Sequence, residues 1–205
     1  MVDINIKNVE DVVKGSLEKA LEASLNNRLR SSIFVSNIAD GLYSFYKDSN
    51  EHLALRVIGF DEDTGAGVEG EKMLDISIAK TKAIIDPDKE ISKAIIGYQL
   101  IWAVESEANS GLPDFADDFG KLLCVKSKNY LYLNGLDQLQ EKSRLSYIDR
   151  RLEVAKQLLE DAELEYDNFY YAFWPSPAKN MNHNKSFWDM NKKDDLLGMV
   201  RVFEL

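Results

Sequence analysis

Residues 95–107 read IIGYQLIWAVESE, a run of aliphatic and aromatic side chains that ends in two carboxylates. Residues of these types favour a long β-strand. Side chains alternate between the two faces of a strand, so Glu105 and Glu107 lie on the same face. The stretch therefore predicts a long strand that carries an acidic pair near its end.

Two further strands are predicted before this one. Residues 53–60 (LALRVIGF) and 72–79 (KMLDISIA) are both rich in strand-forming residues. Together with residues 95–107 they predict an antiparallel meander. Residues 80–93, where Pro87 stands among several charges, favour an excursion between the second and third strands.

Two helices are predicted ahead of the strands. Apolar residues recur at every fourth position of the first helix, which we expect Asn8 to cap. The second helix is expected to follow a cap at Ser31 and Ser32 and to have one apolar face. The apolar positions of the two helices are Val9, Val13, Leu17, Leu21, Leu25, Phe34, Ile38, Leu42 and Phe45.

A helix and another strand follow the acidic pair. Pro113 suits the first position of a helix that runs to about Cys124. Residues 130–133 (YLYL) predict a short strand, and the intervening helix can be the crossover to a parallel neighbour. Cys124 lies in an apolar run and is expected to be buried.

The C-terminal part of the chain predicts one long helix and two strands. The helix spans roughly residues 136–164, and the strands are residues 168–174 (NFYYAFW) and 197–203 (LGMVRVF). The whole order predicts an α/β (α+β) fold in which helices flank a central mixed sheet.

Length and composition favour one domain that spans residues 1–205. The single cysteine excludes an intrachain disulfide and fits a reducing compartment. We see no secretory leader at the start, and no apolar run reaches the length needed to cross a bilayer. We therefore expect a cytoplasmic protein that does not partner a membrane.

Three acidic residues stand where strands are expected to be buried. Asp75 lies in the apolar run MLDISI, and Glu105 and Glu107 end the next strand. Buried carboxylates are costly unless they are paired or bound to cations. Carboxylates that converge from neighbouring strands make a natural Mg²⁺ site, and such an ion can activate water and neutralise a phosphodiester. Glu71 is a further acidic candidate if the strand of Asp75 extends back to it.

This pattern resembles the PD-(D/E)XK nuclease superfamily, which has the restriction-endonuclease-like fold. The family pattern is an Asp on the second strand of an αβββαβ core, a variable gap, and then Glu-X-Lys. Asp75 matches the Asp, and Glu105-Ser106-Glu107 matches the second element in its Glu-X-Glu form. The resemblance covers about residues 10–135, and residues 136–205 add a C-terminal helix and strands.

The resemblance implies an endonuclease that depends on Mg²⁺ or Mn²⁺. Asp75 and Glu105 would hold the metal, and Glu107 would be a further ligand or would orient water. Position 107 lacks the lysine of the family pattern. In some members the lysine has moved onto the next helix, which makes Lys121 the catalytic lysine here, with Lys126 as the reserve.

More than one function remains open. The first is a metal-dependent phosphodiesterase acting on DNA, and the second is a non-catalytic interaction or regulatory module of the same fold. That module would bind a partner protein or form a homo-oligomer through its aromatic C-terminal strands. The net charge of −10 favours the module, because DNA-binding proteins usually have a basic surface. In such a module Glu105 and Glu107 would face water, and Asp75 would pair with a lysine or arginine. A third function is a small-molecule enzyme that uses the same carboxylates.

Overall fold

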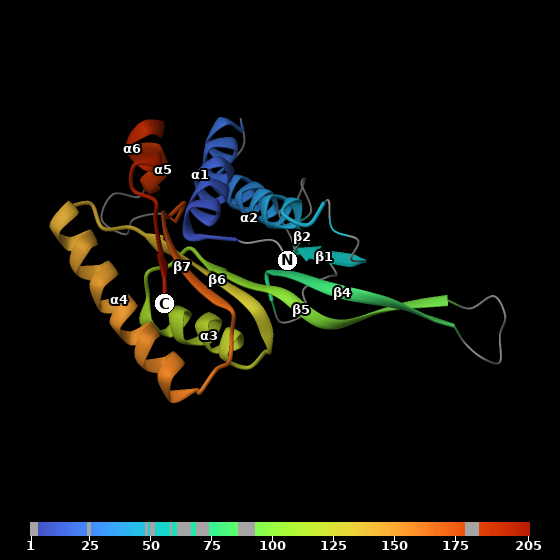
Figure 1. Ribbon diagram of the computed structural model, residues 1–205. Coiled ribbons are helices and arrows are strands. Elements are labelled where there is room, and N and C mark those ends of the chain that lie inside the picture. The colour runs from blue at the N-terminus through green and yellow to red at the C-terminus, as the bar shows by residue number, and fades with distance from the viewer. Residues whose placement is uncertain are drawn as a thin grey trace.

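A six-stranded mixed sheet forms the centre of the protein, and helices lie on both of its faces (Figure 1). The computed structural model describes residues 4–23, 26–47, 49, 52–57, 59–60, 67–68, 74–85, 93–178 and 185–205. In spatial order the strands are β1 (Leu53–Val57), β4 (Ile76–Ile85), β5 (Lys93–Glu107), β6 (Ser127–Leu136), β7 (Asn168–Pro175) and β8 (Arg201–Glu204). The helices are α1 (Ile6–Glu22), α2 (Asn27–Ser44), α3 (Leu112–Leu123), α4 (Glu141–Asp161), α5 (Phe187–Met190) and α6 (Lys193–Leu197).

The predicted meander and crossover are both present. β1 pairs antiparallel with β4, and β4 pairs antiparallel with β5. β5 and β6 are parallel and are joined through α3, as β6 and β7 are joined through α4. β8 then pairs antiparallel with β7. A separate two-stranded sheet is formed by β2 (Gly59–Phe60) and β3 (Gly67–Val68).

The second strand of the meander lies further along the chain than predicted. β4 begins at Ile76, so the predicted start at residue 72 is wrong, and its pairing with β5 continues to the partners Ile85 and Lys93. Residues 80–85 and 93 of the expected excursion are therefore strand, and residues 86–92, with Pro87, lie outside the described residues. Figure 1 shows β4 and β5 extending beyond the other strands as a long arm. The two strands satisfy each other's backbone groups, so pairing persists where the side chains are polar.

The two helix caps predicted at the start of the chain are wrong. Asn5 caps α1, and its side chain accepts a hydrogen bond from the backbone N–H of Asn8. The side chain of Asn8 in turn accepts from the backbone N–H of Asn5, which completes a capping box. Asn26 caps α2 by accepting from the N–H of Leu29. Both helices begin earlier than predicted because the Asn residue nearer the N-terminus supplies the capping oxygen.

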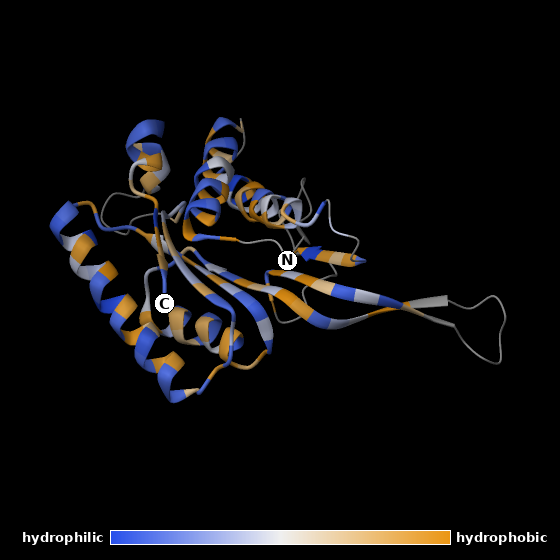
Figure 2. Cartoon of the chain, in the orientation of Figure 1, coloured by the Kyte–Doolittle hydropathy of each residue, from blue (hydrophilic) through white to orange (hydrophobic). Residues whose placement is uncertain are grey.

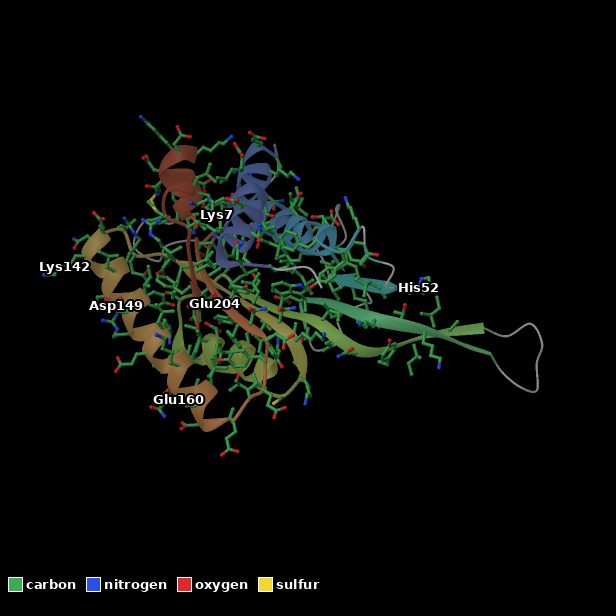
Figure 3. All side chains as sticks on the ribbon, in the orientation of Figure 1. Lys7, His52, Lys142, Asp149, Glu160 and Glu204 are labelled. Atoms are coloured by element: carbon green, nitrogen blue, oxygen red, sulfur yellow. The ribbon has the colours of Figure 1, made fainter. Side chains whose placement is uncertain are left out.

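Each face of the sheet has its own apolar core. Helices α1, α2, α5 and α6 cover one face, and α3 and α4 cover the other. Figure 2 shows hydrophobic and hydrophilic residues alternating along α4, with a hydrophilic outer side. Lys142, Asp149 and Glu160 mark this outer side, whereas His52 lies beside β1 (Figure 3). None of the helices in the described ranges is long and apolar enough to cross a lipid bilayer.

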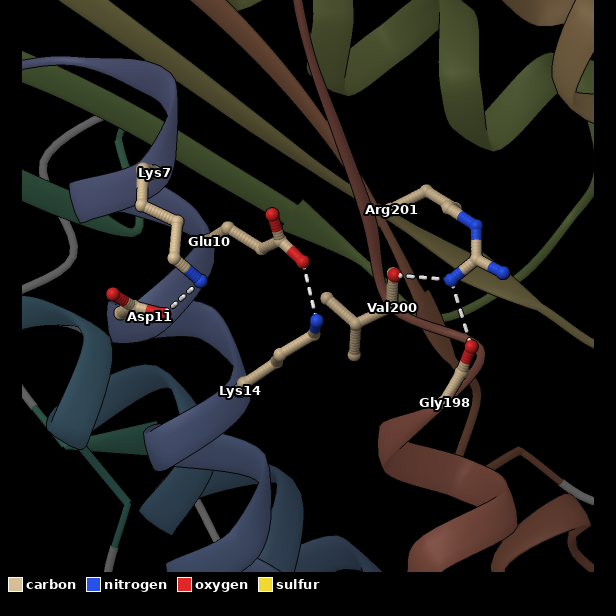
Figure 4. Close-up of polar contacts among 7 residues, drawn as sticks. All are labelled: Lys7, Glu10, Asp11, Lys14, Gly198, Val200 and Arg201. Carbon is tan, nitrogen blue, oxygen red and sulfur yellow. Dashed lines mark hydrogen bonds and ion pairs between the residues drawn. The ribbon is translucent and has the colours of Figure 1, made fainter.

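Local polar contacts hold the surface elements on the α1 side (Figure 4). Ion pairs one helical turn apart join Lys7 to Asp11, at 2.9 Å, and Lys14 to Glu10 along α1. Arg201 donates from Nη1 to the carbonyl oxygens of Gly198 and Val200, at 2.7 and 2.8 Å. These bonds fix the turn that carries the chain from α6 into β8.

The burial of β7 and that of Cys124 differ. The aromatic strand β7 lies between β6 and β8, and all of its residues from Phe169 to Trp174 are fully buried. Its side chains are core, and the edge of the sheet at this end is β8, so the homo-oligomer through the C-terminal strands stays a prediction. Cys124, which was expected to be buried, is exposed. It follows the last residue of α3 as the C-cap and points outward.

Candidate functional site

Strand pairing brings Asp75 next to the acidic pair of β5. Ile76 is opposite Val104 in the register of β4 and β5, so Asp75 stands beside Glu105 and Ser106. The Oδ2 atom of Asp75 accepts from the backbone N–H of Ser106 at 2.8 Å. The convergence of Asp75 with Glu105 that the sequence predicted is therefore present.

Glu105 is a buried carboxylate. Its side chain is 1% exposed, and Oε2 lies 3.2 Å from the Nζ atom of Lys121. Within the described part of the chain, Oε1 has no hydrogen-bond partner. Burial raises the pKa of Glu105 to about 8, and the neighbouring charge of Asp75 adds to the shift against the opposing effect of Lys121.

Helix α3 places Lys121 against Glu105. Phe115, Phe119 and Leu122 form the buried face of the helix, which packs over β5 and β6. Phe119 stacks on Phe115 at a centroid distance of 5.0 Å and meets the edge of Tyr132 at 5.4 Å. Packing therefore fixes the rotation of the helix, and with it the direction of Lys121.

Lys121 is shared between two carboxylates. Besides Glu105, it contacts Oδ1 of Asp118 at 2.7 Å, one helical turn earlier. Burial alone would lower the pKa of Lys121, but the hydrogen bond to Asp118 and the charge of Glu105 raise it above its ordinary value. Lys121 therefore stays charged, yet one cation does not neutralise both acids.

Glu107 lies on the same side of β5 as Glu105 and faces α3. Its Oε1 atom accepts from the backbone N–H of Asn109 at 2.5 Å. Burial raises the pKa of Glu107 to about 7, and a side-chain hydrogen bond with Asp118 and the charge of Asp114 act in the same direction. Near neutral pH this carboxyl group can both give and take a proton.

Tyr132 completes this part of the site from β6. It stands opposite Glu105 in the parallel register, and it is fully buried. Among the residues that the structure describes, none forms a hydrogen bond with its hydroxyl group. Burial raises the pKa of Tyr132, with smaller contributions from Tyr171 and Asp118. Two buried polar groups that find no hydrogen-bond partner among the described residues, Glu105 Oε1 and Tyr132 Oη, thus lie at facing positions of β5 and β6.

Three members of the site were not predicted from the sequence. These are Asp114, Asp118 and Tyr132. Asp118 had one available signal, because it precedes Lys121 by three residues on a predicted helix. Tyr132 had none, since an aromatic residue within a buried strand is usually core.

Asp75 also borders a small pocket on the α2 side of the sheet. The pocket has a volume of about 200 Å³, and Arg28, Ser31, Ser32 and Ser106 are among its lining residues. The two serines that were predicted to cap α2 lie inside the helix and line this pocket instead. Asp75 therefore lies between this pocket and the site at Glu105.

Two of the predicted site residues are not brought to this place. Lys126 pairs with Glu165 at 3.3 Å, and both side chains are more than 80% exposed. In the register of β5 and β6 it lies six residues before Tyr132, which is roughly 20 Å along the strand. Glu71 lies outside the described residues.

The donor set fits a hard divalent cation by its chemistry. Mg²⁺ is commonly bound through one or two carboxylates with water completing the shell, and Asp75, which directly precedes β4, and Glu105 of β5 are such a pair. Oε1 of Glu105 is buried and lacks a hydrogen-bond partner in the described ranges, as a group that meets a cation would. No cluster of three or more His, Cys, Asp or Glu side chains in those ranges is arranged to hold a metal ion.

Comparison with known proteins gives no match to a protein-family model, to a curated protein or to a solved structure.

Proposed function

We propose that this chain is a Mg²⁺- or Mn²⁺-dependent phosphodiesterase that acts on DNA, built on a restriction-endonuclease-like core. One observation carries the proposal. Lys121 pairs with Glu105 and Asp118, Asp75 lies beside Glu105 at the start of the neighbouring strand, and Glu105, the most buried of these acids, has an oxygen without a partner in the described ranges. A buried carboxyl oxygen without a hydrogen-bond partner favours a bound cation, which would take the place of the proton on Glu105.

Each residue has a role that its surroundings suit. Asp75 and Glu105 would hold the divalent ion, which when bound polarises a phosphoryl oxygen and lowers the pKa of coordinated water. Lys121, held charged by Asp118, places a positive charge beside the attacked phosphate. Glu107, with a pKa of about 7, accepts a proton from the attacking water.

The test is cleavage of supercoiled plasmid and single-stranded DNA with Mg²⁺ or Mn²⁺. Asp75→Asn is the sharpest variant, because Asn keeps an oxygen that accepts from Ser106 while the charge is lost. We expect Asp75→Asn and Glu105→Gln each to reduce cleavage by about 100-fold or more. Correctly folded Asp75→Asn protein that cleaves as fast as the wild type would rule out the proposal.

Matched controls are available on the outer side of α4. Asp149→Asn and Glu160→Gln make the same chemical changes at exposed positions (Figure 3). Lys156→Met is the corresponding control for Lys121→Met. All three control variants should cleave as the wild type does, so that a loss caused only by altered net charge is recognised.

A non-catalytic module of the same fold is the second candidate. It is favoured by the contacts that already occupy the site, since Asp75 accepts from Ser106 and Lys121 bridges Glu105 and Asp118. In such a module the cluster only holds α3 to the sheet. Calorimetry separates the two candidates, because the module would bind neither Mg²⁺ nor Mn²⁺ at Asp75 and would not cleave DNA.

A further inference from the structure

A groove runs along the sheet face that α3 covers only in part. In Figure 1, α3 lies against β6 and the inner part of β5, while β4 and the outer part of β5 continue beyond it. The groove has a volume of about 670 Å³, and β1, β4, β5 and the start of β6 line it. It lies beside the carboxylate site, on the same face of the sheet.

The charge of the groove is opposite to that of the protein. The whole chain carries a net charge of −10. Among the described residues that line the groove, Arg56, Lys126 and Lys128 are cationic and none is acidic. Lys126 has a partner in Glu165, but the two side chains are 84% and 86% exposed, and ion pairs of this kind are weak. The groove is therefore a local site for a polyanion.

Part of the groove lining consists of small side chains. Ala54 of β1 stands opposite Ala79 of β4, and Gly97 of β5 stands opposite Thr81. Small residues allow a flat group to approach the sheet closely. Tyr98 lies at the groove with 62% of its surface exposed, so its ring is free to stack on a base.

We propose that this groove binds a single-stranded nucleic acid, with Arg56 and Lys128 contacting phosphates and Tyr98 stacking on a base. Positive charge along a groove combined with an exposed aromatic ring is the usual means of holding a single strand. The volume lies within the range of about 300–1,000 Å³ that is typical of ligand pockets. That is room for a short length of one strand.

The groove leads to the carboxylate site. Arg56 is opposite Ser77, and Ser77 is opposite Ala103, two residues before Glu105 on the same strand. A phosphate at Arg56 would thus lie roughly 7 Å along the strands from the level of Glu105 and, because β1 is two strands from β5, roughly 10 Å across the sheet. A nucleic-acid strand held in the groove would place its next phosphates at Glu105 and Lys121. This path rests on the proposed function. Binding in the groove itself does not require cleavage.

The experiment measures binding in the presence of EDTA, so that cleavage does not contribute. A fluorescein-labelled oligo(dT) is titrated with protein, and anisotropy is followed at several salt concentrations. The variant pair Arg56→Glu/Lys128→Glu is compared with Lys142→Glu/Lys156→Glu, which makes the same charge change on the outer side of α4. Arg56→Gln/Lys128→Gln is the milder pair if the glutamates prevent folding.

We expect Arg56→Glu/Lys128→Glu, the groove pair, to lower the affinity for oligo(dT) by at least about tenfold. The slope of log affinity against log salt concentration should fall in magnitude by about 1.4, the value for two lost phosphate contacts. Tyr98→Ala should lower affinity about fivefold or more and leave the salt slope unchanged. Equal affinities for the groove pair and the α4 pair would overturn the proposal. So would a duplex that binds as tightly as the single strand.

The outcome is separable from that of the proposed function. Glu105→Gln should keep the binding of oligo(dT) even if it abolishes cleavage. Groove-dependent binding by a protein that never cleaves DNA would support the groove and refute the phosphodiesterase. Metal-dependent cleavage with groove variants that bind like the α4 controls would support the phosphodiesterase and refute the groove.

Discussion

The Nζ atom of Lys121 lies 3.2 Å from Oε2 of Glu105, so a lysine near the end of α3 meets a carboxylate near the end of β5. The acid is 1% exposed and the lysine 33% exposed. The contact therefore joins the buried Glu105 carboxyl group to a lysine that is still partly exposed to solvent. Because Lys121 also serves Asp118, any change at the lysine alters the charge balance of the whole site.

Replacing the lysine should destabilise the protein in a pH-dependent manner. Lys121→Met leaves Glu105 buried beside Asp75 without its cation. We expect the free energy of unfolding to fall by about 2 kcal/mol at about pH 9. Breaking a fully buried ion pair costs roughly 3–5 kcal/mol, and the cost is smaller here because the lysine is partly exposed. Near pH 6 the loss should be smaller, since Glu105, with a pKa of about 8, is already neutral there. Urea denaturation of Lys121→Met and of Lys121→Met/Glu105→Gln checks this, and a loss that is equal at both pH values contradicts it.

Stability should fall as the pH rises through the neutral range. The folded-state pKa of Glu105 is raised from 4.5 to about 8, so the folded protein binds a proton that the unfolded chain has released. This contribution is complete below pH 4.5 and is lost as the pH approaches 8, by an amount on the order of 5 kcal/mol. Glu107, with a pKa of about 7, acts with the same sign. Denaturation between pH 5 and 8 should give a flatter profile for Glu105→Gln than for the wild type, with Glu160→Gln as the unchanged control.

Divalent cations should reverse that trend. A cation that binds Asp75 and Glu105 competes with the proton on Glu105, so stabilisation by Mg²⁺ should increase from pH 6 to pH 8. At a concentration of about 100 times Kd, we expect a rise in Tm of about 5–10 °C. Thermal unfolding of the wild type, Asp75→Asn and Glu105→Gln measures this. An equal rise in all three proteins would locate the cation elsewhere.

Sequence patterns were sufficient to predict the strands of the site. Alternation put Glu105 and Glu107 on one face, and the meander put Asp75 on the neighbouring strand. The limits of β4 were not predictable in this way, because Ile76–Ile85 includes polar positions whose strand geometry comes from pairing with β5. Local propensity is outweighed by a partner strand in such a case.

The rest of the site depends on packing between distant segments. Asp118 and Lys121 reach β5 because Phe115 and Phe119 fix the rotation of α3 against Tyr132. No periodicity specifies such a rotation. Likewise, Lys126 follows the end of α3, which was predicted at about Cys124, but the register of β6 against β5 places Lys126 six residues before Tyr132 and away from the site.

A single methyl group on β6 should disturb the acidic end of β5. A Cβ atom at Gly135 would lie 2.2 Å from the carbonyl oxygen and 2.7 Å from the carbonyl carbon of Ala108, the residue after Glu107. Backbone at that distance must move, and the bond from Ser176 Oγ to the same oxygen, now 2.6 Å, would break. We therefore expect Gly135→Ala to cost about 3 kcal/mol and to displace Glu107 from Asn109.

Gly120 provides the matched control within α3. A Cβ atom there meets nothing within 4 Å among the described residues, so Gly120→Ala should stabilise the helix by about 0.5–1 kcal/mol. The two alanine variants are compared by urea denaturation, and carboxyl resonances of Glu107 are followed by NMR as the pH is changed. In the wild type, the hydrogen bond from the Asn109 N–H lowers the pKa of Glu107. Gly135→Ala should move this N–H away, so the pKa of Glu107 should rise above about 7. A Gly135→Ala protein as stable as the wild type, with Glu107 titrating as before, would show that the close approach of β6 to Ala108 does not hold the acidic pair in place.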